Sequence, residues 1–221
     1  MSAGIERVIL WDIDKTLLQS DKRVNLFDNA FESLFGHPKP EEARIDKSGK
    51  VDGQIAREYL AIENSGDFRG YMDALNRISV DYYTANPLAC VPGIPEILKA
   101  TRAAGSVNGL YTGNTRERAQ VKLTTAGIAP KDYFDGFERG AAFCQGYTSN
   151  RLDGVKDVRD RFTPDQLLVV GDTQRDHDLA LALGCAFWQV GSSEIRDDDA
   201  ICVGKSDDFE GEFAQRFLAI L

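Results

Sequence analysis

Residues 7–16 read RVILWDIDKT, a short apolar run that ends in two aspartates and a threonine. An apolar run of this length, closed by polar residues, predicts a buried strand over residues 7–11. Asp12, Asp14 and Thr16 then follow the carboxyl end of that strand. Ligands bind beyond the carboxyl ends of the strands in open α/β sheets, so these residues are candidates for a functional site.

Similar apolar runs recur along the chain and alternate with helical patterns. Strands separated by helices predict right-handed β-α-β units, and therefore a parallel sheet with helices on both faces. The expected fold class is α/β, with a Rossmann-like parallel sheet. Further strands are expected at residues 107–112, 167–170, 186–190 and 200–203, and helices at 94–104, 116–126, 153–162, 176–183 and 209–220.

One segment interrupts this alternation. Residues 20–89 carry polar, helical patterns at 26–35, 53–63 and 68–84, without a convincing buried strand. The α/β pattern resumes at the turn-like sequence Val91-Pro92-Gly93. We therefore expect an inserted helical domain over residues 19–90, and an α/β core formed by residues 1–18 and 91–221.

Two other predicted strands also end in polar residues. Thr112-Gly113-Asn114 closes one, and Asp172 and Asp176 follow the other. Two carboxylates about 4 Å apart repel by about 4 kcal/mol at an effective dielectric of about 20, so such a cluster usually holds a cation or shares protons. The chain has only two histidines, and an oxygen-rich site favours Mg²⁺, which also binds phosphate oxygens. This combination suggests phosphate chemistry.

The three motifs together resemble those of the haloacid dehalogenase-like superfamily. Asp12-x-Asp14-x-Thr16 is similar to its first motif, Thr112-Gly113-Asn114 to its second, and Gly171-Asp172 with Asp176 to its fourth. The resemblance implies a phosphatase in which the inserted helices form a cap domain. The sequence Lys-Val-Asp-Gly-Gln at residues 50–54 is similar to a loop of the phosphoglycolate phosphatase-like members.

The resemblance also implies a role for each motif residue. Asp12 would be the nucleophile that forms an aspartyl-phosphate, and Asp14 would be the general acid and then the base. Thr112 and the backbone N–H of Gly113 would hold the phosphoryl oxygens. The implied Mg²⁺ ligands are Asp12, Asp14 through its backbone carbonyl, Asp172 and Asp176, and the implied substrate-binding residues include Thr16, Gly113 and Asn114.

The third motif of the family requires a Lys or Arg near the phosphoryl group. Arg151 precedes the helix expected at 153–162 and is the first choice, whereas Lys156 lies inside that helix and is the alternative. Lys15 is a departure, because many relatives carry glycine there, and we expect its side chain to point outward. His177 follows Asp176 and is expected to be an exposed helix residue.

Composition excludes several classes of function. The 221 residues carry a net charge of −9, which argues against nucleic-acid binding. No apolar run approaches the roughly 18 residues of a membrane helix, and we expect neither a signal peptide nor a membrane partner. The four cysteines form no C-x-x-C pair, which fits a reducing, cytoplasmic setting. The oligomeric state stays open.

The sequence therefore predicts a Mg²⁺-dependent phosphatase that acts on a small phosphorylated metabolite. A capped phosphomutase of the same superfamily is an alternative, because it would use the same aspartyl-phosphate. A non-catalytic phosphate-binding relative is a third reading. A phospho-acceptor receiver domain would be much shorter and would lack the helical insertion.

Overall fold

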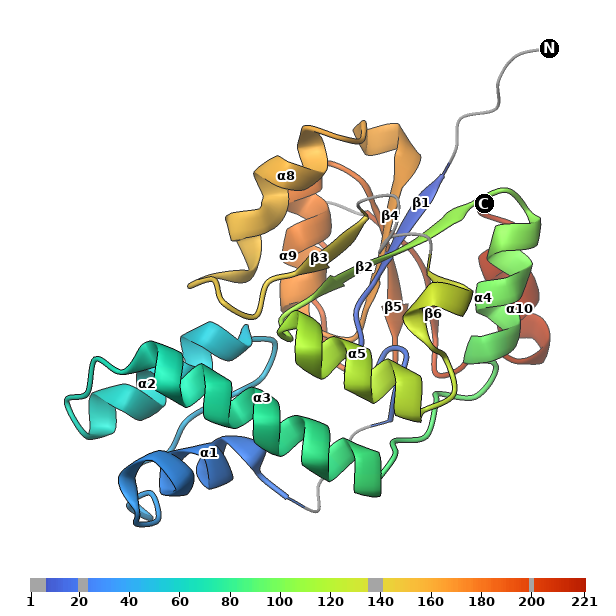
Figure 1. Ribbon diagram of the computed structural model, residues 1–221. Coiled ribbons are helices and arrows are strands. Elements are labelled where there is room, and N and C mark those ends of the chain that lie inside the picture. Colours follow the sequence, from blue (N-terminus) through green and yellow to red (C-terminus); the bar gives the residue numbers. More distant parts are fainter. Residues whose placement is uncertain (1–6, 20–23, 135–140, 199–200) are drawn as a thin grey trace.

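A computed structural model describes residues 7–19, 24–134, 141–198 and 201–221. Within these residues one sheet of six parallel strands runs in the order β3-β2-β1-β4-β5-β6 (Figure 1). The predicted α/β fold class is confirmed. The strands are β1 (Val8–Trp11), β2 (Val107–Thr112), β3 (Ala142–Cys144), β4 (Leu167–Gly171), β5 (Ala186–Val190) and β6 (Cys202–Ser206).

Alternate side chains of β1 enter two separate apolar clusters. Ile9 and Trp11 join one cluster, whereas Val8 and Leu10 join the other. Successive side chains of a strand point to opposite faces of the sheet, so both faces are covered. Helices α4 (Ile94–Ala103), α5 (Arg116–Thr125) and α10 (Gly211–Leu218) contribute to the first cluster, and α8 (Val155–Arg159) and α9 (Gln174–Leu183) to the second.

The central position of β1 determines where its polar continuation lies. Trp11 stands opposite Leu110 of β2 and Val170 of β4, and Asp12 extends the pairing by donating its N–H to the Val170 carbonyl at 2.9 Å. The residues that follow β1, β2 and β4 therefore meet at one edge of the sheet.

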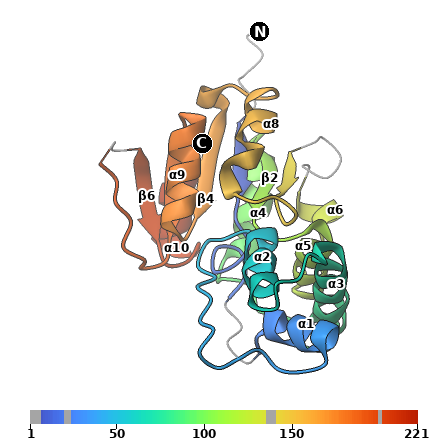
Figure 2. The same ribbon diagram turned by 90° about the vertical axis from the view of Figure 1, so that its left-hand side faces the viewer.

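Three helices between β1 and β2 lie beside that edge. They are α1 (Leu26–Phe35), α2 (Asp52–Ile62) and α3 (Phe68–Ala85), and both ribbon views place them together at one end of the strands (Figures 1 and 2). Phe27, Phe31, Tyr59 and Tyr71 pack ring against ring between them. No described helix has the length and apolar character needed to cross a lipid bilayer.

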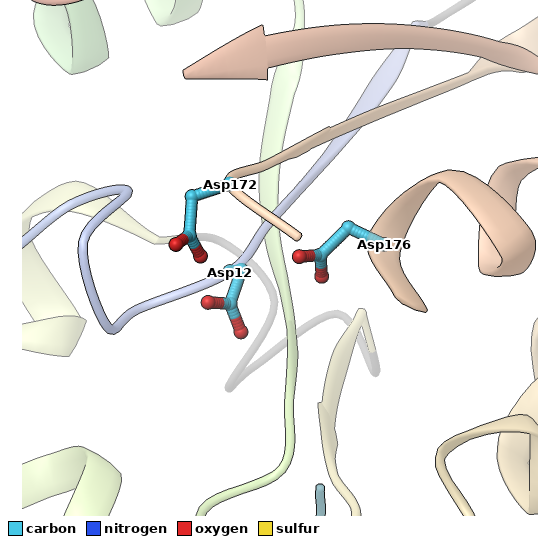
Figure 3. Close-up of side chains that lie close together, drawn as sticks. All are labelled: Asp12, Asp172 and Asp176. Atoms are coloured by element: carbon cyan, nitrogen blue, oxygen red, sulfur yellow. The ribbon is translucent and has the colours of Figure 1, made fainter. Parts of the chain in front are cut away.

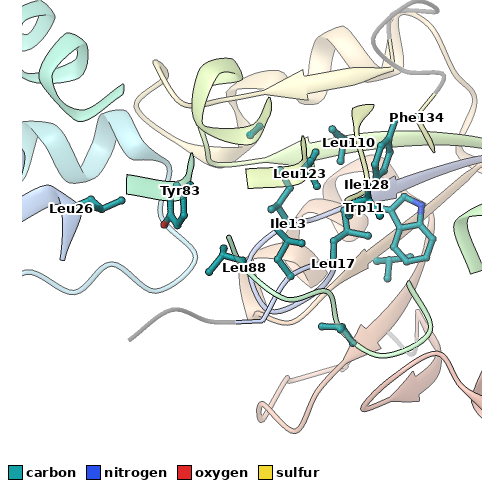
Figure 4. Close-up of a cluster of buried hydrophobic side chains, with 14 of the residues drawn as sticks. Trp11, Ile13, Leu17, Leu26, Tyr83, Leu88, Leu110, Leu123, Ile128 and Phe134 are labelled. Carbon is teal, nitrogen blue, oxygen red and sulfur yellow. The ribbon is translucent and has the colours of Figure 1, made fainter. Parts of the chain in front are cut away.

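The apolar core continues from the sheet into these helices. Leu26 and Tyr83 of the inserted helices belong to the same buried cluster as Ile13, Leu17 and Leu88 (Figure 4). Helices α1–α3 thus contact the core partly through buried apolar side chains.

The structure differs from the sequence predictions in four places. Strand β3 was not expected, and helix α6 (Pro130–Tyr133) was also missed. Strand β6 runs to Ser206 rather than ending at 203, and Ala200 lies outside the described residues. The helix expected at 153–162 is a short 3₁₀ turn, η1 (Arg151–Gly154), followed by α8. Asn150 and Asp153 form a capping box there, which starts the turn two residues early. A second such turn, η2 (Pro164–Gln166), precedes β4.

Candidate active site

Three buried carboxylates converge at the edge of the sheet. Asp12 follows β1, Asp172 follows β4, and Asp176 lies in the first turn of α9. One oxygen atom from each lies within 4.8 Å of the others, and the three side chains point toward a common space (Figure 3). Asp12, Asp172 and Asp176 are called the carboxylate triad below.

Arg151 reaches into the carboxylate triad from the start of η1. Its Nη2 donates to Asp12 Oδ1 at 2.8 Å and also bonds Asp176, while its Nε is buried without a hydrogen-bond partner among the described residues. Asp176 is further fixed by Thr173, whose N–H and hydroxyl donate to its Oδ2 at 3.0 and 2.6 Å. The structure thus brings the first-choice cation of the third motif against Asp12.

Two members of the carboxylate triad, Asp12 and Asp172, have strongly raised pKa values. Burial raises the pKa of Asp12 to about 8, and repulsion from Asp176 and Asp172 adds to the effect of burial against the opposing Arg151 guanidinium. Burial and the neighbouring Asp176 raise the pKa of Asp172 to about 7, although the Lys15 ammonium lies 3.9 Å away. Carboxylates that resist ionisation at this spacing form an oxygen donor set suited to a hard divalent cation.

Asp14 has a different environment, because its side chain is half exposed and lies between two donors. Lys122 Nζ donates to both carboxylate oxygens, at 2.7 and 2.9 Å, and Asn114 Nδ2 donates to Oδ2 at 2.8 Å. Desolvation raises the pKa of Asp14, but Lys122 and Asn114 outweigh it and lower the pKa to about 2. The pKa of Asp12 is therefore raised and the pKa of Asp14 is lowered, although both aspartates belong to the first motif.

The second motif lies between the sheet and the inserted helices. Thr112 is fully buried, and its hydroxyl accepts from the Asn114 side chain at 2.9 Å. Gly113 accepts the Asp52 N–H at 2.8 Å, and a Cβ at Gly113 would come within 2.9 Å of the Lys50 carbonyl. Glycine is needed here because the start of α2 approaches so closely.

The backbone of the turn after β1 would suit glycine at residue 15. Lys15 has a φ of 61°, in the left-handed region where a side chain is unfavourable. Its side chain is 57% exposed, yet its ammonium lies on the rim of the cavity beside Asp172. The neighbouring Thr16 is buried, and its hydroxyl has no partner within the described part of the chain.

Lys156 and His177 lie away from the carboxylate triad. Lys156 is 80% exposed, bonds Asp160 at 2.5 Å and lines no part of the cavity described below. The expectation that His177 is exposed was wrong: it is 1% exposed, and its Nε2 lies 2.8 Å from Asp197 Oδ1. Asp197 also accepts the backbone N–H groups of Ile201 and Cys202, so it connects α9 to the start of β6.

A cavity of about 430 Å³ opens beside Asp12 and Asp14. Its walls come from the sheet edge, the Gly113 turn, helix α5 and the inserted helices. A cavity of this size is typical of small-molecule sites. Its lining includes Asp12, Asp14, Lys15, Asn25, Phe27, Lys47, Lys50, Ile55, Tyr83, Asn114, Arg118, Lys122, Arg151 and Asp172.

Sequence reasoning missed two buried cations on α5. Lys122 bonds Asp14, and Arg118 bonds Asp52 of α2 and donates from Nε to Ser79 Oγ of α3 at 3.0 Å. Asp52 lies in the 50–54 stretch noted above, and it also accepts the Thr115 N–H at 2.8 Å. Arg118 and Lys122 are four residues apart, so they share one helix face, and that spacing was the available signal.

A comparison of the sequence with models of protein families supports the α/β fold described above. A family model described as haloacid dehalogenase-like hydrolase matches residues 9–190. No curated protein matches the sequence closely enough to count as a relative.

Solved structures share the fold at low sequence identity. A haloacid dehalogenase hydrolase of family IA, variant 3, from Entamoeba histolytica has a TM-score of 0.66 at 16% identity, over 97% of this chain and 99% of that one. A predicted phosphoglycolate phosphatase from Haemophilus somnus has a TM-score of 0.64 at 20% identity, over 94% and 96%. A predicted β-phosphoglucomutase from Thermotoga maritima has a TM-score of 0.60 at 16% identity, over 97% and 100%. With the family model covering most of its length, the chain belongs to the haloacid dehalogenase-like hydrolase family.

Proposed function

We propose that the protein is a Mg²⁺-dependent phosphatase that hydrolyses a small phosphorylated metabolite through an aspartyl-phosphate on Asp12. The observation that carries the proposal is the pairing of two unlike aspartates. Asp12 is buried against Arg151, and Asp14 is held by Lys122 at the wall of a cavity. A buried nucleophile next to a separate acid or base is what phosphoryl transfer in two steps requires.

In the first step Asp12 would attack phosphorus in its ionised form, which Arg151 stabilises and a bound Mg²⁺ would stabilise further. The P–O bond to the leaving group breaks, and Asp14 supplies a proton to the departing oxygen. Arg151, 2.8 Å from Asp12, would draw the phosphoryl oxygens to the nucleophile through its guanidinium. The buried, unpaired Nε of Arg151 is a further donor available to that group. Thr112 and Gly113 would contact the same oxygens from β2.

In the second step a water molecule would attack the aspartyl-phosphate. Asp14 accepts a proton from the water, and the electron pair of the breaking P–O bond returns to Asp12. Inorganic phosphate then leaves the site. Asp14 ends this step protonated and, because Lys122 and Asn114 hold its pKa at about 2, passes the proton to the departing phosphate or to solvent, so it takes up a proton again to serve as the acid of the next cycle.

The carboxylate triad fits a Mg²⁺ ion by the chemistry of its donor set. Three carboxylates offer oxygen atoms within 4.8 Å of one another, and the pKa values of Asp12 and Asp172 stay raised although Arg151 and Lys15 lie beside them. Asp12, Asp172 and Asp176, with the Asp14 carbonyl, would hold the ion. Bound there, it would neutralise the charge of the phosphate that a carboxylate must approach.

We also propose that residues 19–90 act as a cap domain over a core of residues 1–18 and 91–221. Support comes from the lining of the cavity, to which α1, α2 and α3 all contribute. A wall of this kind excludes bulk water and restricts the substrate to a small molecule.

One comparison favours a second candidate function. The fold similarity to a predicted β-phosphoglucomutase covers 97% of this chain. A mutase would form the same aspartyl-phosphate but return the phosphoryl group to a substrate oxygen instead of water.

Release of inorganic phosphate from a panel of small phosphate esters tests the proposal. We expect release that requires Mg²⁺ and stops with chelator. A mutase would instead isomerise a sugar phosphate in the presence of its bisphosphate with little phosphate release. Failure of folded protein to do either would refute both enzymatic readings.

A further inference from the structure

Lys122 occupies a position that the proposed reaction does not by itself explain. The lysine is 3% exposed on α5, and its ammonium contacts Asp14 Oδ1 at 2.7 Å, Asp14 Oδ2 at 2.9 Å and Asn114 Oδ1 at 2.8 Å. These three contacts use all three N–H donors of a lysine. The ring of Tyr83 covers it at 5.4 Å.

The neighbouring cation on the same helix face serves a different purpose. Arg118 is committed to Asp52 and Ser79 of the inserted helices. Among the described residues, the Lys122 ammonium contacts Asp14 and Asn114 of the core motifs and the ring of Tyr83. Its placement therefore bears on Asp14 rather than on attachment of α1–α3.

Lys122 and Asn114 together determine the direction of the Asp14 carboxylate. An ionised carboxylate has about four acceptor positions. Lys122 fills two of them and Asn114 a third, while the side chain stays half exposed toward the cavity. One acceptor position is thus left for an incoming molecule such as water.

We propose that Lys122 is a positioning residue that holds Asp14 as the base for hydrolysis of the aspartyl-phosphate. The inference rests on the proposed function. In the step concerned, the water oxygen bonds to phosphorus, one water proton passes to the free acceptor position of Asp14, and the P–O bond to Asp12 breaks with its electron pair going to Asp12. Lys122 keeps its proton throughout.

The test separates the two chemical steps in Lys122→Met. With p-nitrophenyl phosphate and Mg²⁺, rapid-quench measurement should show a burst of about one nitrophenolate per active site. Steady turnover should then fall about 100-fold, in the range found for loss of a general base. Acid-quenched protein should retain phosphate on Asp12. Turnover should also become the same for p-nitrophenyl and alkyl phosphates, because hydrolysis of the common intermediate limits both.

Three further variants make the result specific. Lys122→Arg keeps a cation with several donors, and its steady turnover should be at least tenfold higher than that of Lys122→Met. Lys99→Met removes an exposed lysine of α4, which stacks on Tyr133, and should match the wild-type protein. If Lys122→Met misfolds, the double variant Asp14→Asn with Lys122→Met replaces it, because this variant removes both charges of the pair. It should hydrolyse the intermediate no more slowly than Asp14→Asn alone.

Two outcomes overturn the inference. One is equal slowing of the burst and of turnover in Lys122→Met, which would indicate a general structural role. The other is an additive loss in the double variant, which would mean that Lys122 acts without Asp14. If wild-type protein releases no phosphate with Mg²⁺, the proposed function fails first, and the inference fails with it.

Discussion

Replacing Asp172 by asparagine should stabilise the metal-free protein. Asp172 is 4% exposed and belongs to the carboxylate triad, where ionisation is opposed by burial and by Asp176. An amide has nearly the same shape and carries no charge. Removing a group that resists ionisation in the fold therefore removes a cost of folding.

The structure sets the size of this effect in two ways. Two ionised oxygens 4.8 Å apart repel by about 3.5 kcal/mol at an effective dielectric of about 20. The pKa of Asp172 rises from 3.8 to about 7, which corresponds to about 4 kcal/mol at roughly 1.36 kcal/mol per unit. A gain of up to about 4 kcal/mol should raise Tm by about 8–16 °C, at roughly 2–4 °C per kcal/mol for a chain of this length.

The pH dependence follows from the direction of the shift. Between pH 4 and pH 7 the folded protein keeps the Asp172 proton and the unfolded chain has lost it, so wild-type stability falls as pH rises through this window. The asparagine variant lacks this loss. Its advantage should be small near pH 4, grow up to pH 7 and stay constant above.

Thermal unfolding in chelator at pH 4.5, 6, 7 and 8 measures the difference directly. Added Mg²⁺ should raise Tm of the wild-type protein more than that of the variant, because a bound ligand stabilises the state that binds it. A variant that is no more stable than wild type in chelator at pH 8 would refute the electrostatic reasoning.

Three other perturbations test separate parts of the molecule. Asp12→Asn should abolish phosphate release while its circular dichroism and Tm stay near wild type or above, and measurable turnover would exclude Asp12 as nucleophile. Asp52→Asn leaves the Arg118 charge buried without its ionic partner and should cost about 3–5 kcal/mol in urea unfolding. The double change Asp52→Leu with Arg118→Met should cost much less, and equal losses would show that the ion pair is not the cause. Gly113→Ala places a Cβ within 2.9 Å of the Lys50 carbonyl and should cost about 1–3 kcal/mol in the same assay, whereas an unchanged midpoint would mean that α2 moves away freely.

The sheet could be predicted because its central strands are short apolar runs with polar ends. The same pattern indicated where the polar residues after β1, β2 and β4 would gather, since parallel strands end at one edge. Strand β3 has three residues, too few for any periodicity. Turn η1 starts at Arg151 because the Asn150 side chain caps it, and Asn150 lies outside the helix expected at 153–162.

The cations of α5 could not be found from periodicity alone. The sequence of α5, RERAQVKLTT, is typical of a solvated surface helix. Arg118 and Lys122 become buried because α3 and the turn after β1 pack against this helix. His177 was misjudged for a related reason. Its cover comes from the loop that carries Asp197, twenty residues later in the chain. The spacing of Arg118 and Lys122 indicates a shared helix face, but the local sequence does not show that a distant segment buries it.

The inserted helices meet the sheet through two chemically different zones. In the apolar zone Leu26 and Tyr83 share the core with Ile13 and Leu88, and in the polar zone Asp52 bonds Arg118. Apolar surface gains nothing when it is wetted, whereas charged groups recover hydration. The separation of α1–α3 from the sheet that costs least free energy therefore keeps the apolar zone in contact and parts the polar zone. The helices would rotate about the apolar zone. Salt screens a buried ion pair weakly, so ionic strength should act little on the closed arrangement and mainly on the separated charges once the polar zone is wetted.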